Sequence, residues 1–494
     1  MASAGDISWA IGAFRDDQKL DRYKRARTYY FGNQPSPFNR ERMKTIFRGL
    51  FEDVKDNLCP AVVDSIIDRL QVTGFSSSET QEPNPQTRAA WDLWQRNQMD
   101  LRSQEVHREA LLTGDGYVLV WPDKNLQAVM WPQLAHEIAV MYDPDRPGVL
   151  KLAAKMWIAD EDRRLRLNLY YPDRIEKFQS IQKPENSSTW AQTNLTERDF
   201  EPIPASEQAG VGTGVLGDPS VVPNPYGRVP IFHFANKRFQ SPGISELTDV
   251  YPLQDALNKA MTDLLVAMEF SSYRQRWVTG LDVGELDDSG RPKHPPFNHG
   301  ADKILAASSI ETQFGEFAAT DLTQFLEVHE NLRSEIARVS GTPLHYLFIT
   351  RGDFPSGEAM KSAEARFTKK VIDRQINFGN TWEDAVAFGM QIDGDELPPN
   401  YRLSTNWTDA SPTTPREIAE TMLMKKALGV SERELLKELG YDEQLIEQML
   451  KENAEREALV VDLATGNGRV AVNKNTVTVP GAEANLPLPI TPSG

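Results

Sequence analysis

Three long segments in the second half of the chain carry apolar residues three or four positions apart, the spacing that gathers side chains on one face of an α-helix. They are residues 245–276, 321–340 and 355–394. Gly341 and Pro343 follow the second segment, and both residue types commonly end a helix. At about 1.5 Å per residue, the third segment predicts a helix of roughly 55 to 60 Å.

The stretch between the first two helices, residues 273–320, lacks this periodicity. It offers two short strand candidates, residues 274–278 and 303–305, on either side of a segment rich in proline and glycine. One helix therefore leads out to a small module of strands and loops, and a second helix leads back. This order predicts a module held away from the main body on a stalk of two helices.

The first half of the chain predicts helices followed by a mainly antiparallel sheet. The helices are expected at 18–31, 36–51, 56–70 and 87–112, and the strands at 117–121, 126–131, 137–142, 150–159, 164–171, 175–180 and 229–235. Leu165, Leu167 and Leu169 alternate with more polar positions, so one face of the sheet is expected to meet water or another subunit. Residues 184–225 are rich in proline, glycine and serine and predict a long flexible loop.

The C-terminal part predicts one more strand and a group of short helices. Residues 402–408 are expected to form the strand and residues 411–415 a linker. Helices are expected at 418–428, 431–439 and 442–459, with Ser431 as an N-cap and Glu434 three residues later. Gly, Asn, Thr and Pro dominate from residue 462, which predicts a disordered end. The fold class is therefore α+β.

Charge and composition narrow the classes of partner and compartment. The 494 residues include 54 Lys and Arg against 71 Asp and Glu, a net charge of −17, so the whole protein is not expected to adhere to nucleic acid or to an anionic membrane. The single cysteine, Cys59, excludes an internal disulfide and is expected to be a small buried hydrophobe. No segment reaches the roughly 20 apolar residues of a membrane span, and residues 1–17 lack a signal-peptide pattern. We expect a soluble protein made in the cytoplasm.

Motifs for catalysis or cofactor binding have simpler explanations in this sequence. Residues 212–217 match the glycine spacing of a dinucleotide-binding turn, but prolines flank them where a strand and a helix would be needed. His294 and His299 stand in a proline-rich loop without the further ligands of a metal site, and the acidic stretch 282–288 is explained by a solvated loop. The chain also lacks a phosphate-binding Gly-x-x-x-x-Gly-Lys-Ser/Thr motif. We expect no cofactor, no metal and no catalytic residue.

Several local sequences occur in an order that points to a family. Residues 29–33 read Tyr-Tyr-Phe-Gly-Asn, residues 245–247 read Ser-Glu-Leu before Leu-Gln-Asp-Ala-Leu-Asn-Lys at 253–259, and residues 355–360 read Pro-Ser-Gly-Glu-Ala-Met. With these motifs and its order of elements, the chain resembles the portal proteins of tailed bacteriophages, particularly those of siphoviruses of Gram-positive hosts. The resemblance extends from about residue 19 to residue 459.

The resemblance implies how the chain is divided. A β-rich wing would comprise 1–244, the two stem helices 245–272 and 321–340, the clip 273–320, the channel (tunnel) loop 341–354, the spine helix with the rest of the wing 355–410, the helical crown 411–460 and a disordered tail 461–494.

The resemblance also implies a function. Portal proteins form a ring, commonly of twelve subunits, at one capsid vertex, through which DNA enters during packaging and leaves during infection. The chain would then be a non-enzymatic head-tail connector of the virion, made in the host cytoplasm. Its expected partners are copies of itself, double-stranded DNA, the terminase large subunit, the head-tail adaptor, and the major capsid and scaffold proteins, without a membrane.

Three groups of site residues follow from these assignments. The channel loop would present Thr350, Arg351, Gly352 and Asp353; the clip would contact DNA or terminase through Arg291 and Lys293; and the stem would pack against neighbouring subunits through Leu257, Met261, Leu264, Phe325 and Leu326. An acidic wall suits a sliding duplex, because each Lys or Arg contact with phosphate adds affinity and hence friction. For Arg351, Arg291 and Lys293, a solvated or intersubunit charge explains the residue equally well.

Two other classes of function remain open from the sequence. One is a hydrolase with a stalked regulatory module, acting through the acidic loop, which predicts a deep pocket inside one subunit. The other is a scaffold ring that binds no nucleic acid. Rings with a central hole wide enough for duplex DNA would separate the portal interpretation from the hydrolase.

Overall fold

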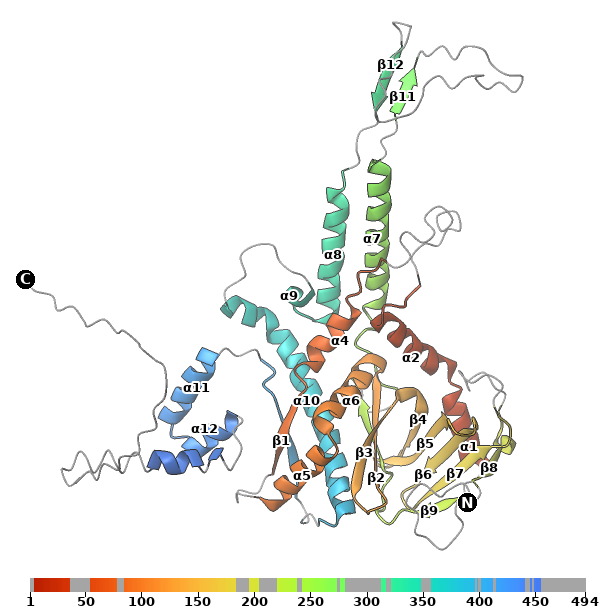
Figure 1. Ribbon diagram of the computed structural model, residues 1–494, viewed down its shortest axis with the longest axis vertical. Coiled ribbons are helices and arrows are strands. Elements are labelled where there is room, and N and C mark those ends of the chain that lie inside the picture. Colours follow the sequence, from red (N-terminus) through yellow and green to blue (C-terminus); the bar gives the residue numbers. More distant parts are fainter. Residues whose placement is uncertain are drawn as a thin grey trace, which may run out of the picture. The chain divides into compact units, whose positions relative to one another are not determined.

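The computed structural model describes residues 4–35, 54–77, 84–183, 195–203, 220–237, 242–272, 276–279, 312–316, 321–347, 357–395, 398, 401–411, 415–439, 445–446 and 448–454. The chain forms two compact units, Met1–Pro412 and Thr413–Gly494. The first unit mixes helices with antiparallel sheets, in agreement with the expected mixture of the two (Figure 1).

One long helix, α10 (Gly357–Asp393), forms the centre of the first unit (Figure 1). Its 37 residues correspond to about 55 Å, which confirms the long helix predicted at 355–394. Its large apolar side chains, among them Phe367, Phe378 and Trp382, are completely or almost completely buried. Helices and strands from both halves of the sequence pack around these side chains.

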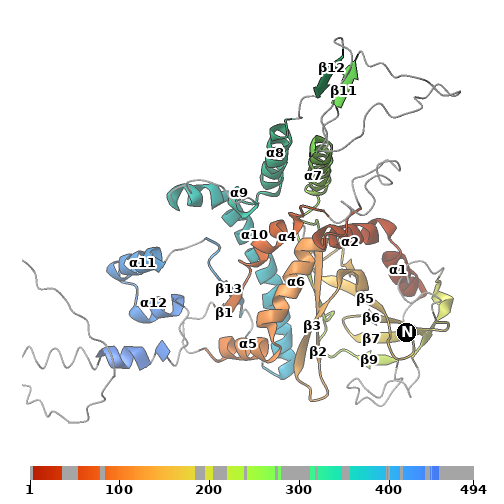
Figure 2. The same cartoon turned by 45° about the horizontal axis from the view of Figure 1, so that its top comes forward.

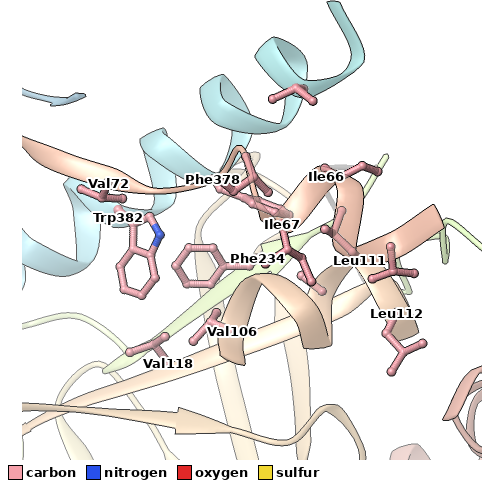
Figure 3. Packing of buried hydrophobic residues seen from close by; sticks show 14 of the residues in the cluster. Ile66, Ile67, Val72, Val106, Leu111, Leu112, Val118, Phe234, Phe378 and Trp382 are labelled. Carbon is pink, nitrogen blue, oxygen red and sulfur yellow. The ribbon is translucent and has the colours of Figure 1, made fainter. Parts of the chain in front are cut away.

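The core beside α10 is rich in aromatic rings (Figure 3). Phe234, on strand β10 (Ile231–Ala235), lies between Phe378 and Trp382 of α10, with ring centroids 5.9 and 4.5 Å away. Ile66 and Ile67 of α4 (Cys59–Ile67) and Val106, Leu111 and Leu112 of α6 (Met99–Thr113) enclose the same cluster. Segments more than 300 residues apart in sequence therefore share one core.

A buried histidine accepts the polar hydrogen of Trp382. The indole nitrogen donates to Nε2 of His107 at 2.8 Å, and the His107 ring stacks on Phe378 at 5.4 Å. Burial lowers the pKa of His107 to about 3, so the ring is neutral and can accept this hydrogen bond.

The helix predicted at 87–112 is in fact two helices, α5 (Pro85–Arg96) and α6. The break lies at Gln98, which has a left-handed backbone conformation with φ 55°. The buried side chain of Asn97 donates to the carbonyl of Ala128 at 3.2 Å and accepts from the amide of Met130 at 2.9 Å. The break is thus stabilised by tertiary hydrogen bonds, and no glycine or proline marks it in the sequence.

Three antiparallel sheets are formed by the strands from β1 to β10 together with β13. The first sheet has the order β10-β2-β3, with β2 (Asp115–Pro122) and β3 (Ala128–Gln133). The second sheet pairs β1 (Val72–Ser77) with β13 (Leu403–Trp407). The third and largest sheet contains, in sequence order, β4 (Ile138–Tyr142), β5 (Leu150–Ile158), β6 (Leu165–Tyr170), β7 (Arg174–Ser180) and β8 (Phe200–Pro202), and β9 (Val221–Pro223) also pairs with β7. All the strands predicted between 117 and 235 are confirmed. The predicted loop at 184–225 contains β8 and β9, so it contributes to the sheet.

The larger sheet is covered by a helix that the sequence pattern did not predict. Helix α1 (Ala4–Phe14) lies beside this sheet (Figure 2). Its residues Ile7, Ile11 and Phe14 belong to the same buried cluster as Leu165 and Leu167. The leucine face is therefore buried under α1. Arg166 and Asn168 on the other face are only partly buried, in keeping with the expectation that one face of the sheet meets water or another subunit. Helix α2 (Asp17–Tyr30) then confirms the helix predicted at 18–31. The helix predicted at 36–51 lies outside the described residues.

The small module between the stalk helices contains an antiparallel strand pair, β11 (Arg276–Thr279) and β12 (Gln313–Glu316), with Trp277 opposite Gly315. Strand β11 overlaps the predicted strand at 274–278, but its partner is β12. The other strand candidate, 303–305, lies outside the described residues.

The second unit contains α11 (Pro415–Ala427) and α12 (Glu432–Glu438). The amide of Glu434 donates to the Ser431 hydroxyl at 3.3 Å, which confirms the predicted N-cap. Helical residues also occur at 445–446 and 448–454, within the third predicted helix. Leu423, Met424 and Leu428 leave large apolar side chains exposed on and just after α11.

Two glycines make close backbone contact where α6 meets the segment leading to the stalk. Gly114 ends α6 with φ +97°, and a Cβ atom on Gly243 would collide with the Gly114 carbonyl. The amide of Gly243 also donates to the buried carboxylate of Asp115 at 2.9 Å.

We expect Gly243→Ala to lower the free energy of unfolding by about 2 kcal/mol, because the two backbone segments at Gly114 and Gly243 must move apart to make room for the added Cβ. Urea unfolding followed by tryptophan fluorescence measures this loss. Gly12→Ala is the control, because Gly12, like Gly243, has no positive φ, and no atom lies within 4 Å of the added Cβ; equal effects of both changes would contradict the crowding.

Candidate functional site: the stem and its root

The two helices of the predicted stalk are α7 (Tyr251–Ser272) and α8 (Thr323–Ser340), which lie side by side and are called the stem below (Figures 1 and 2). They confirm the first two periodic segments, although α7 begins six residues later than residue 245. Leu257 is fully buried and Leu264 nearly so within a single chain. These two leucines are therefore unavailable to a neighbouring subunit, contrary to the intersubunit role expected from the apolar stripe.

Other apolar side chains of the stem are about half exposed in the single chain. Leu326 and Val328 on α8 are 51% and 50% exposed, and Met268 on α7 is 47% exposed. Met261 and Phe325 are partly buried. Exposed apolar groups that gather on one two-helix element indicate a protein contact surface. Of the five stem residues singled out by the sequence, Leu326 fits intersubunit packing best.

The base of α7 is fixed to the body by two buried amides, Gln254 and Asn258. Gln254 accepts from the amide of Leu58 at 3.0 Å and donates to the carbonyl of Asp56 at 2.6 Å, while Asn258 accepts from the amide of Asp56 at 3.1 Å. Because the two residues stand four apart in the apolar stripe of α7, their side chains share one face. Polar residues within a buried stripe are the sequence signal that could have located this contact.

The same segment is held by α8. The guanidinium of Arg333 donates to the Asp56 carboxylate at 2.7 and 3.1 Å, and Nε2 of His329 lies 3.2 Å from the same carboxylate. Burial and the nearby Arg333 charge lower the pKa of His329. Residues 56–58 are therefore held between α7 and α8, and we call this contact the stem root.

The tyrosines at 29–33, one of the motifs behind the family resemblance, border the stem root. The hydroxyl of Tyr29 donates to the carboxylate of Asp255 on α7 at 2.7 Å, and its ring lies 4.7 Å from that of Tyr251. The Tyr30 hydroxyl donates to Asp64 on α4 at 2.8 Å. The motif thus joins α2 to the stem and to α4.

Glu246, in the motif at 245–247, ties the start of the stem to α10. Its buried carboxylate lies 2.8 Å from Lys370 and 2.7 Å from Arg374 of α10, and 3.1 Å from Lys237. Burial alone would raise the pKa of Glu246, but the three cations hold it well below its usual value. The sequence marks Glu246 as part of a family motif, but it does not show that three cations surround the buried carboxylate.

The buried pair of Asp115 and His233 has the composition that a hydrolase would need. Nε2 of His233 lies 2.8 Å from Asp115, and Nδ1 lies 2.5 Å from the Tyr142 hydroxyl. Burial and the Asp115 charge raise the pKa of Tyr142, so its hydroxyl keeps its proton at neutral pH. Asp115 also accepts from Tyr23 at 2.5 Å, so the network joins α2, β2, β4 and β10 as structural support.

The Asp115 network predicts how stability depends on pH. Burial raises the pKa of Asp115, but bonds with His233, Tyr23 and Gly243 outweigh burial and lower it to about 2. The charged Asp115 carboxylate therefore contributes about 2 kcal/mol to the free energy of unfolding when the pH is above its unfolded-state pKa. This contribution is lost as the pH falls from there through the folded-state pKa. We expect Asp115→Asn to be destabilising at pH 6 and nearly neutral near pH 2, in urea unfolding at each pH. A difference between the two proteins that does not change with pH would contradict this.

Cys59 confirms the expectation of a small buried residue. It is fully buried, and burial with the nearby Asp255 raises its thiol pKa to about 12. In the part of the chain that the structure describes, no group of three His, Cys, Asp or Glu could hold a metal ion. None of the described helices is both long and apolar enough to cross a bilayer.

Several predicted site residues lie outside the described residues. They are the channel-loop residues Thr350, Arg351, Gly352 and Asp353, the clip residues Arg291 and Lys293, the histidines His294 and His299, and the acidic stretch 282–288. Their roles stay predictions.

Comparison with known families gives a match over most of the chain. The family model described as "Phage portal protein, SPP1 Gp6-like" matches residues 15–458. The chain is also 24% and 25% identical, over 419 residues, to the portal proteins of Mycobacterium phages L5 and D29. Each alignment covers 81% of this chain and 79% of the relative.

Solved structures with similarity to this chain come from gene transfer agent particles. They are a native virion and the necks of an empty and a native particle, the last two computed with sixfold and twelvefold symmetry. Each of the three chains is 14% identical to this chain, and each alignment covers 83% of this chain and 96% of the solved chain. The TM-scores are 0.44 for the virion, 0.45 for the empty neck and 0.43 for the native neck.

Proposed function

The chain belongs to the SPP1 Gp6-like family of phage portal proteins, the head-tail connectors of virions, and we propose that its copies form a ring whose channel conducts double-stranded DNA during packaging and ejection. The observation that carries the ring is the stem. Its two helices are fixed to the body at the stem root, while Leu326 and Val328 on α8 remain about half exposed. Apolar groups on a rigid element are available to identical neighbours in a closed ring.

The division into wing, stem, clip, channel loop, spine and crown is part of this proposal. Helices α7 and α8 would be the stem, α10 the spine, and the strand pair β11–β12 part of the clip. The second unit, from Thr413, begins within two residues of the expected crown boundary. The channel loop would begin at Gly341, the C-cap of α8 with φ +68°, include the short helix α9 (Leu344–Leu347) and lead into α10.

The charge of the subunit supports a channel that does not retain DNA. With a net charge of −17, the subunit opposes tight binding to phosphates, and positive residues such as Arg351 would guide the duplex at single points. With fewer phosphate contacts, the affinity for DNA also depends less on salt concentration. A channel wall of this kind would let the duplex move inward during packaging and outward during ejection.

The partners beyond the ring are proposed from the family alone. They are the terminase large subunit and the head-tail adaptor at the clip, where Arg291 and Lys293 would contact DNA or terminase, and the major capsid and scaffold proteins. A ring of twelve subunits is proposed on the same basis.

Deletion of the gene from its phage tests the function. We expect particles without packaged DNA and without joined tails, and restoration of both by the wild-type gene supplied in trans. Heads filled with DNA in the absence of the protein would contradict the proposal. Glu335→Ala, which removes an exposed ion pair with Arg338 on α8, serves as the complementing control that should restore growth.

A further inference from the structure

One arginine that the stem does not use, Arg69, connects three separate parts of the first unit. It lies two residues after the last residue of α4, and its side chain is mostly buried. One terminal nitrogen donates to the carbonyl of Ala410 at 2.6 Å, and the other donates to Glu364 of α10 at 3.0 Å and to the hydroxyl of Tyr346. Tyr346 belongs to the short helix α9 (Leu344–Leu347).

Glu364 links the same arginine to a second residue of α9. Its other carboxylate oxygen accepts from the Tyr346 hydroxyl at 3.1 Å and lies 2.8 Å from Nε2 of His345. Burial alone would raise the pKa of Glu364, but Arg69 and these partners hold it below its usual value. The carboxylate is therefore charged at neutral pH, with partners on both oxygens.

The backbone around Arg69 makes a parallel set of contacts. Gln375 of α10 donates from one amide nitrogen to the carbonyls of Arg69 and Thr408, each at 3.0 Å. The amide of Thr408 donates to the carbonyl of Gln71 at 2.9 Å. The segment 408–410 is thus joined to α10 and to residues 69–71 at several points.

Aromatic rings enclose the guanidinium. Its central carbon lies 5.0 Å from the ring centroid of Phe367 and 5.7 Å from that of Tyr346, and the two rings meet edge to face at 5.7 Å. A planar guanidinium in such a setting keeps one orientation, because its faces and its edges are both engaged.

We propose that Arg69 is a positioning residue that couples α9 and the first half of α10 to the segment leading into the second unit, so that a displacement at one is transmitted to the other. The inference rests on the proposed function, since α9 lies within the assigned channel loop, α10 follows that loop and Ala410 precedes the assigned crown. The loop and the crown would then respond to each other through one side chain.

Hydrogen exchange in the full-length protein tests the coupling, with Glu364→Gln as the central variant. Glu364 contacts Arg69 and α9 but has no hydrogen bond to residues 408–410 among those of the described residues. We nevertheless expect exchange in peptides covering 408–411 to rise roughly fivefold, together with exchange in 344–347, because Arg69 loses its charged partner. A local structural role of Glu364 would raise exchange in 344–347 alone, and that result would overturn the proposal.

Variants of Arg69 complete the test. Arg69→Met is expected to raise exchange in both peptides roughly tenfold or more, and Glu364→Gln added to it should change 408–411 no further. Arg69→Lys keeps the charge but lacks the planar fork, so it should not restore slow exchange; full restoration by lysine would contradict positioning by the fork. Arg338→Met, at an exposed arginine of α8, is the matched control and should leave both peptides unchanged.

Electron microscopy of the same samples separates this inference from the proposed function. Wild-type protein without rings would contradict the portal assignment. Rings whose exchange at 408–411 is insensitive to Glu364→Gln would contradict the coupling alone.

Discussion

Leu326→Asp is expected to leave the chain folded but unable to form rings. Leu326 is 51% exposed in the single chain, so aspartate costs the folded subunit little, within about 0.5 kcal/mol. In a ring, the same position would bury an unpaired carboxylate against the neighbouring stem and lose the burial of a leucine. We estimate a loss of at least about 3 kcal/mol per interface, or more than a hundredfold in affinity.

Mass photometry and circular dichroism measure the two parts of this prediction. The variant should show the mass of a monomer and the helical signal of the wild type. Leu126→Asp is the matched control, because Leu126 is 74% exposed in the turn between β2 and β3 and its φ of 61° suits aspartate. Normal rings from Leu326→Asp would refute the stem interface. Leu264→Asp would test folding instead, because Leu264 is buried within its own chain.

Glu246→Ala is expected to lower the free energy of unfolding of the first unit by about 3–5 kcal/mol. The change leaves Lys237, Lys370 and Arg374 close together without the carboxylate that neutralises them. Breaking a buried ion pair by removing one partner is costly, because the remaining charges stay desolvated. Glu246→Gln keeps the shape and part of the hydrogen bonding, so it should fall between the wild type and the alanine variant.

Tryptophan fluorescence during urea unfolding, at one fixed protein concentration, reports this loss. All ten tryptophans lie within the first unit, so the second unit does not contribute to the signal. Glu335→Ala is the control, since its bridge with Arg338 is exposed and its removal should cost less than about 0.5 kcal/mol. Equal midpoints for Glu246→Ala and Glu335→Ala would show that the buried cluster does not hold the stem to α10.

The elements with strong periodicity could be predicted from the sequence, because their apolar faces are local properties. The stem helices, α10 and the strands from β2 to β7 were all found in this way. The break between α5 and α6 was missed because Asn97 stabilises it through β3, and β1 was missed because its partner, β13, lies more than 300 residues away. Such features depend on contacts that no local pattern contains.

The stem residues show a similar limit. An apolar stripe shows which side chains are expected to be buried, but it does not show whether they pack against the same chain or against another copy. The structure separates the two cases, with Leu257 buried in its own chain and Leu326 exposed. In the same way, the motifs at 29–33 and 245–247 indicated the family, whereas their contacts with Asp255 and Lys370 became visible only in three dimensions.

Cryo-electron microscopy of the purified full-length protein tests the central claim most directly. We expect closed rings in which α7 and α8 of successive copies surround a central hole wide enough for double-stranded DNA, with Leu326 buried against the neighbouring stem. A monomer, or a closed ring in which Leu326 faces solvent or the centre is too narrow for a duplex, would contradict it.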